Sequence, residues 1–163
     1  MKAYIKWMSG ALAVLLAFLV VYLKLNPPLV SEGQGYIVKD PGVVTVELQN
    51  EGIHKVNLTG IVVNDGNRPE MVRMGVSRTS ALIGIFAVEE EMEGVSFHSI
   101  DAYAIEPVLS REEVIQLEDV NDRSTIRHYG VVVRHDERID SVRVKYTYFG
   151  IPFVKEIKIE RLE

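Results

Sequence analysis

The sequence predicts an all-β protein, an antiparallel β-sandwich preceded by one N-terminal transmembrane helix. Short runs in which apolar and polar residues alternate recur after residue 35, and a period of two indicates strands with one buried face. Turn-forming residues separate these runs, and no long helical period follows the opening stretch. That stretch carries no charged residue from Trp7 to Leu23. A closed barrel is the alternative arrangement of the same strands.

The opening stretch has the features of a membrane anchor. The 17 uncharged residues from Trp7 to Leu23 span roughly 26 Å as a helix, at the lower edge of what crosses a bilayer core. Trp7 and Tyr22 lie at its two ends, where amphipathic rings favour the headgroup region. Lys2 and Lys6 precede it, so the positive-inside bias predicts a cytoplasmic N-terminus.

The residues expected to form the anchor surface are Trp7, Leu12, Leu15, Phe18, Tyr22 and Leu23. A cleaved signal peptide is one alternative, but the best cut, after Ser31, is preceded by Leu29 rather than by a small residue. A buried helix of a soluble protein is the other, and it would show polar residues at helical spacing. The sequence therefore favours an uncleaved signal anchor.

Three segments follow from this reading: residues 1–25 are the cytoplasmic N-terminus and anchor, 26–35 a linker, and 36–163 an extracytoplasmic domain. The chain after residue 25 holds 15 basic and 23 acidic residues. An acidic domain argues against nucleic acid as a partner, since phosphate binding requires clustered Lys and Arg. There is no cysteine, which excludes disulfides and thiolate metal sites.

The first half of the domain predicts three strands. An edge strand is expected near Tyr36–Lys39, and alternation predicts strands over Val43–Gln49 and Lys55–Val63. Asn50–Gly52 connects the last two. The Asp-Gly pair within Asn64–Asn67 is a strong tight-turn signal.

The middle of the chain is less regular. Ser80–Val88 is short and apolar, which favours a buried strand. Val95–Val108 alternates in its first half. In Ser110–Val120, Ser110 and Glu113 fit a capping box that begins a helix, but Val114, Ile115 and Leu117 fit a strand equally well, and we favour the strand.

The last third predicts three consecutive antiparallel strands. They are expected over Thr125–His135, Ile139–Phe149 and Phe153–Leu162, with a turn at Asp136–Arg138. Apolar residues alternate with charged ones in the second and third of these runs, so one face meets a core and the other meets water.

Three longer stretches carry a resemblance to a known fold family: Val44–Asn64, Glu106–Asp119 and His128–Ile159. They resemble, in turn, the early strand pair, the crossing between sheets and the closing strands of immunoglobulin-like or fibronectin-type sandwiches of bacterial surface proteins. With its anchor, the chain resembles small uncharacterised membrane-anchored proteins of Gram-positive bacteria. The resemblance implies an immunoglobulin-like sandwich and transfers no functional residue, because fold alone does not give function.

No residue pattern predicts a catalytic or metal centre. The four histidines, His54, His98, His128 and His135, are scattered, and no calcium-loop, nucleophile-elbow or phosphate-binding motif occurs. We therefore expect no cofactor, no metal and no enzymatic activity.

A basic set on the last strands is the candidate interaction face: Arg127, Arg134, Arg143 and Lys145. These residues alternate with apolar ones, as solvent-facing strand positions do. Facing Glu156 and Glu160, they are expected to form cross-strand ion pairs worth a few tenths of a kcal/mol each.

The expected function is a non-enzymatic interaction or accessory domain at the outer face of a cell membrane. The expected partners are membrane lipid, through the N-terminal helix, and a protein, through strand addition at an exposed sheet edge. The alternative is a binding module for cell-wall polymer or a small ligand, and a hydrolase is disfavoured.

Overall fold

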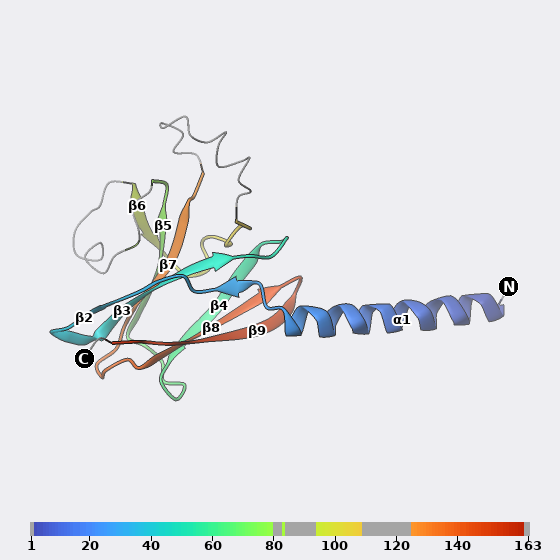
Figure 1. Ribbon diagram of the computed structural model, residues 1–163, viewed down its shortest axis with the longest axis horizontal. Helices are drawn as coiled ribbons and strands as arrows, with labels where there is room; N and C mark the ends of the chain where they lie inside the picture. The colour runs from blue at the N-terminus through green and yellow to red at the C-terminus, as the bar shows by residue number, and fades with distance from the viewer. Residues whose placement is uncertain (1, 80–82, 84–93, 109–124, 162–163) are drawn as a thin grey trace.

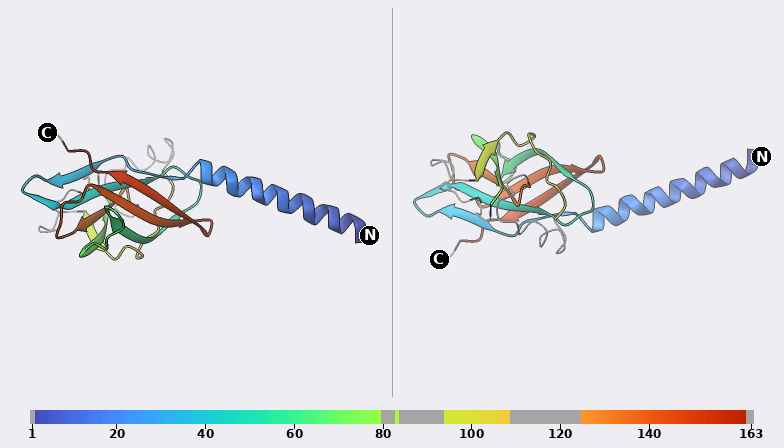
Figure 2. Two further views of the ribbon diagram at one scale, coloured as in Figure 1. Left: turned by 90° about the horizontal axis from the view of Figure 1, so that it is seen from below. Right: turned by 90° about the horizontal axis from the view of Figure 1, so that it is seen from above.

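The structure is a computed structural model that describes residues 2–79, 83, 94–108 and 125–161, with side chains from Gly10 onward. Helix α1 (Lys2–Leu25) extends away from a body of strands, as Figures 1 and 2 show. The backbone N–H of Asn26 makes the last helical hydrogen bond, to the Tyr22 carbonyl, and its side-chain amide donates to the same carbonyl. Pro27 and Pro28 follow and cannot continue the helical hydrogen bonding.

The body consists of nine strands within the described residues. Their bounds are β1 (Leu29–Val30), β2 (Gln34–Ile37), β3 (Asp40–Asn50), β4 (Val56–Val63), β5 (Met71–Ser77), β6 (Val95–His98), β7 (His128–Arg134), β8 (Ser141–Tyr148) and β9 (Ile151–Lys158). One sheet has the order β1-β3-β7-β5-β6, with β2 also paired to β3. The second has the order β4-β8-β9. All strand pairs are antiparallel, so the predicted all-β architecture of two antiparallel sheets is confirmed.

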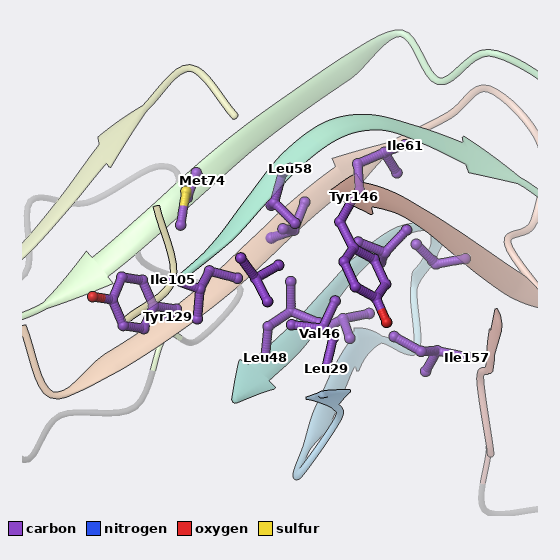
Figure 3. Packing of buried hydrophobic residues seen from close by; sticks show 14 of the residues in the cluster. Leu29, Val46, Leu48, Leu58, Ile61, Met74, Ile105, Tyr129, Tyr146 and Ile157 are labelled. Atoms are coloured by element: carbon purple, nitrogen blue, oxygen red, sulfur yellow. The ribbon is translucent and has the colours of Figure 1, made fainter. Parts of the chain in front are cut away.

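The core lies between the two sheets (Figure 3). Val46 and Leu48 from β3 meet Leu58 from β4 and Tyr146 from β8, and all four side chains are buried. Burial raises the pKa of the Tyr146 hydroxyl to about 12, because its charged form is poorly solvated there. The alternating burial of β8 reproduces the apolar–polar alternation of its sequence.

The segment expected to be a linker contributes to this core. Leu29 is completely buried, and its pairing with Asn50 begins the ladder between β1 and β3. Residues 34 and 35 already belong to β2. The chain is therefore part of the sandwich within four residues of the end of α1.

The three closing strands are not one continuous antiparallel unit, as the sequence suggested. Strand β7 pairs with β3 and β5 in the larger sheet, and only β8 and β9 pair with each other. The chain therefore crosses between sheets at Asp136–Arg138, where a hairpin turn was expected. The local pattern of a strand reports a buried face but not the neighbour that it pairs with.

Strand β5 was not expected from the sequence. Its second half is buried on both faces, because Ile83 covers the outer surface at Gly75. An added Cβ at Gly75 would lie 2.6 Å from a methyl group of Ile83. The strand therefore lacks the alternation that marks a half-buried strand. The strands expected over Ser80–Val88 and Ser110–Val120 lie outside the described residues, apart from Ile83.

In the part of the chain that the structure describes, no helix is both long enough and apolar enough to cross a membrane. The transmembrane helix expected within residues 1–25 is thus not supported by the described residues.

Candidate functional site

The residues expected to form the anchor surface lie on α1, which stands off the sandwich (Figure 1). Leu12, Leu15, Phe18 and Tyr22 are exposed, and Phe18 is the most exposed of them at 71%. Leu23 instead is buried against the core. The side chain of Trp7 lies outside the described part of the helix.

The four residues of the candidate interaction face do not lie on one sheet. Arg127 precedes β7 and Arg134 ends it, so both belong to the larger sheet. Arg143 and Lys145 lie on β8 in the smaller sheet. The sequence showed that these positions alternate with apolar ones, but it did not show that the chain changes sheets between Arg134 and Arg143.

One expected cross-strand ion pair is present. Arg143 on β8 is directly opposite Glu156 on β9, and its Nε donates to a Glu156 carboxylate oxygen at 3.1 Å. Both side chains are partly exposed, so the pair contributes a few tenths of a kcal/mol.

The sequence predicted an exposed sheet edge without locating it, and the outer edge of β9 is such an edge. Strand β9 pairs only with β8 among the described strands. In an antiparallel ladder, successive residues direct their backbone groups alternately toward the partner and away from it. The hydrogen bond from Ile159 N–H to Asp140 C=O, 2.9 Å long, fixes this alternation. Odd-numbered residues of β9 therefore face β8, and the backbone groups of Val154 and Glu156 face outward.

Side chains cap this edge at both ends. At the start of β9, the Lys24 ammonium at the end of α1 donates to the Pro152 carbonyl, and it lies 4.2 Å from the centre of the Phe153 ring. At the far end, the Gln34 side-chain amide lies against Lys158 and Glu160. In the amide orientation that satisfies both groups, it donates to the Lys158 carbonyl at 2.9 Å and accepts from the Glu160 N–H at 2.7 Å.

Between the two caps, no hydrogen bond to the outward backbone groups of Val154 and Glu156 occurs within the described residues. The Val154 side chain is 61% exposed. The N–H groups of Val154, Glu156 and Lys158 and the carbonyls of Val154 and Glu156 therefore form a short open edge, which we call the β9 edge. Unpaired strand edges of this kind are templates for another strand.

The sequence contains one signal for this edge. Proline lacks an N–H, so within sheets it is confined to edge strands and similar positions. Pro152 occupies an outward-facing position of β9, where no N–H is needed for pairing with β8. The caps had no such signal, because Lys24 and Gln34 are more than a hundred residues away in sequence from the groups they contact.

Two turns meet at the end of the body from which α1 emerges. The Phe149 ring stacks on His54 with centroids 4.5 Å apart, and it packs edge-on against Tyr148. The Tyr148 hydroxyl accepts a hydrogen bond from the Ile53 N–H at 3.0 Å. The β3–β4 turn and the β8–β9 turn are thereby joined.

Comparison of the chain with protein-family models, curated proteins and solved structures finds no match.

Proposed function

We propose that this protein is a non-enzymatic interaction domain, held at a membrane by α1, that binds an extended segment of a partner protein along the β9 edge. The observation that carries the proposal is the open pair of residues, Val154 and Glu156, between two capped ends. An added strand pairs with such groups through main-chain hydrogen bonds.

The caps limit how the partner docks. The Lys24 ammonium already bonds to the Pro152 carbonyl, and the Gln34 amide already bonds to the Lys158 carbonyl and the Glu160 N–H. A partner strand therefore has five backbone groups to bond before it meets a side chain. A short register of this kind favours one docking position over sliding along the edge.

The outer face next to the β9 edge is more basic than acidic. Lys145 lies directly opposite Val154, and Lys158 follows two residues after Glu156. Glu156 is already paired with Arg143. The edge therefore favours a partner segment with carboxylates on this face, where ion pairs would reinforce the backbone hydrogen bonds.

The membrane placement rests on the surface of α1. Val14, Leu15 and Leu16 are successive residues, so they point to three different sides of the helix about 100° apart, and all three are exposed. A helix that is apolar all round and not covered by its own domain is covered by lipid or by another protein. The described side chains begin at Gly10, and the uncharged run of the sequence begins three residues earlier at Trp7. We therefore also propose that lipid covers α1, that the N-terminus is cytoplasmic and that the sandwich is extracytoplasmic.

The strand order supports an immunoglobulin-like class for the sandwich. In immunoglobulin constant-type domains, strands A, B, E and D form one sheet and strands C, F and G the other. Taking β1 and β2 as A, the order β3-β7-β5 corresponds to B-E-D, and β4-β8-β9 corresponds to C-F-G. The resemblance to small membrane-anchored proteins of Gram-positive bacteria remains part of the proposal.

A photo-crosslinking residue at Lys158, next to the β9 edge, tests the function in native membranes. The matched control carries the same residue at Asn57, which is exposed on β4 at the other edge of the same sheet. We expect a protein adduct from position 158 and none from position 57. Equal adducts from both positions would contradict the proposal. So would the absence of a protein adduct together with retention of the protein on purified cell-wall polymer.

A further inference from the structure

Three exposed apolar side chains belong to segments at the end of the body where α1 joins it. Leu25 ends the helix, Ile53 lies in the β3–β4 turn, and Phe149 lies in the β8–β9 turn. Their exposed fractions are 75%, 87% and 51%. Figure 1 shows both turns pointing toward the α1 side of the body.

Hydrogen bonds hold these turns against the chain that leaves the helix. Glu51 N–H donates to the Pro28 carbonyl at 2.9 Å, three residues after the end of α1. The buried side chain of Asn50 donates to the carbonyls of His54 and Ile105, and its oxygen accepts from Gly52 N–H. The Lys24 contact with Pro152 fixes the helix end to the start of β9. The turns and the helix end therefore form one rigid surface.

Phe149 occupies its turn at a conformational cost. The two-residue turn Phe149–Gly150 joins Tyr148 to Ile151, and both turn residues have positive φ, +50° and +75°. This is a type I′ turn, in which Asn or Gly is favoured at the first position. A large ring that is both strained and half exposed suggests a contact outside the domain.

We infer that the Ile53 and Phe149 turns lie in the interfacial layer of the membrane that holds α1. The inference rests on the proposed membrane placement. If lipid covers the helix, the residues beside its end meet the boundary between lipid and water. Tyr22, exposed one turn before the helix ends, has the amphipathic ring typical of that boundary. The stacked Phe149 and His54 rings supply further aromatic side chains on the turns at this end of the body.

The opposite end of the body provides a control surface. Val38, in the turn between β2 and β3, is also an exposed apolar residue, at 82%. Figure 1 places this turn at the far end from α1. A single exposed apolar residue is ordinary on a protein surface, so exposure alone does not predict lipid contact. Lipid contact is inferred for Ile53 and Phe149 because their turns lie at the end of the body that carries α1.

Single-tryptophan proteins test the inference. In a Trp7→Phe background, one tryptophan is placed at Ile53, Phe149, Val38 or Phe18. Each full-length protein is reconstituted in phosphatidylcholine vesicles that carry a nitroxide quencher near the headgroups, and matched vesicles carry it deep in the acyl chains. We expect the shallow quencher to reduce the emission of a tryptophan at position 53 or 149, and the deep quencher to reduce that of a tryptophan at position 18. Neither quencher is expected to reduce the emission of a tryptophan at position 38. The two turn positions give independent readings if one variant folds poorly.

Two results would overturn the inference, and they differ. If position 18 is quenched while 53 and 149 behave like 38, the turns are in water and the membrane placement of α1 survives. If position 18 is not quenched either, the membrane placement itself fails, and the inference fails with it.

Discussion

The Lys24 ammonium donates to the Pro152 carbonyl and lies 4.2 Å from the ring centre of Phe153. Residues at the end of α1 and the start of β9 are thus held together. This contact caps one end of the β9 edge and fixes the helix relative to the sandwich. Together with the Gln34 cap at the other end, it leaves Val154 and Glu156 as the open part of that edge.

Replacing Lys24 tests this contact. We expect Lys24→Met to lower the free energy of unfolding by about 0.5–1 kcal/mol, the range for an exposed cation–π contact. Lys24→Arg keeps a cation over the ring and is expected to retain most of the stability. Urea unfolding of the detergent-solubilised protein measures both, and equal stabilities for Lys24→Met and the parent would show that the contact contributes nothing.

Leu29→Ala tests whether β1 belongs to the core. Leu29 is completely buried, so removal of its side chain is expected to cost about 2–5 kcal/mol. Val30→Ala is the matched control, because Val30 is only partly buried. If Leu29→Ala lowered the free energy of unfolding no more than Val30→Ala, the segment would be a linker, as the sequence suggested.

Phe149→Asn separates turn strain from ring packing. Asn accepts positive φ more readily than Phe, but it cannot stack on His54. In a His54→Ala background the stacking is already absent and only the edge-on contact with Tyr148 remains, and there we expect the relief of strain to prevail, so that Phe149→Asn stabilises the protein by about 1 kcal/mol. A destabilisation in that background, measured by thermal unfolding, would argue against strain at this turn.

The Tyr146 hydroxyl predicts a loss of stability in alkali. Its pKa is raised by burial from 10.0 to about 12, so the neutral form stabilises the fold below pH 10. That stability is lost as the pH rises from 10 to 12, by roughly 2 kcal/mol at most, since one pKa unit corresponds to about 1.4 kcal/mol. Tyr146→Phe is expected to lose less stability over this range in urea unfolding. Identical pH profiles for the two proteins would exclude Tyr146 as the titrating group.

The strands that were predicted correctly share one property. Strand β8 has one face on the core and one in water, so its alternation is visible in the sequence. Strand β5 is covered on both faces near Gly75 and shows no alternation. Val131, Val132 and Val133 of β7 are all completely buried, and nothing in that run indicates which sheet it joins.

The sequence predicted what kind of site the domain carries, but not where that site lies. An exposed sheet edge was expected, and Pro152 is compatible with one. The identity of the edge depends on the pairing of β9 with β8 alone, and its length depends on Lys24 and Gln34, which reach it from the other end of the sequence. These are long-range contacts, which local residue patterns do not encode.

Comparing Val154→Pro with Val154→Thr tests whether a partner strand pairs with the β9 edge. Proline removes the outward N–H of residue 154 without removing a hydrogen bond to β8, whereas threonine keeps the N–H and the β-branched shape. Both variants carry the crosslinker at Lys158, and circular dichroism confirms their folding. We expect Val154→Thr to keep the partner adduct in native membranes and Val154→Pro to lose it. An adduct of equal yield from a folded Val154→Pro protein would contradict strand addition at the β9 edge.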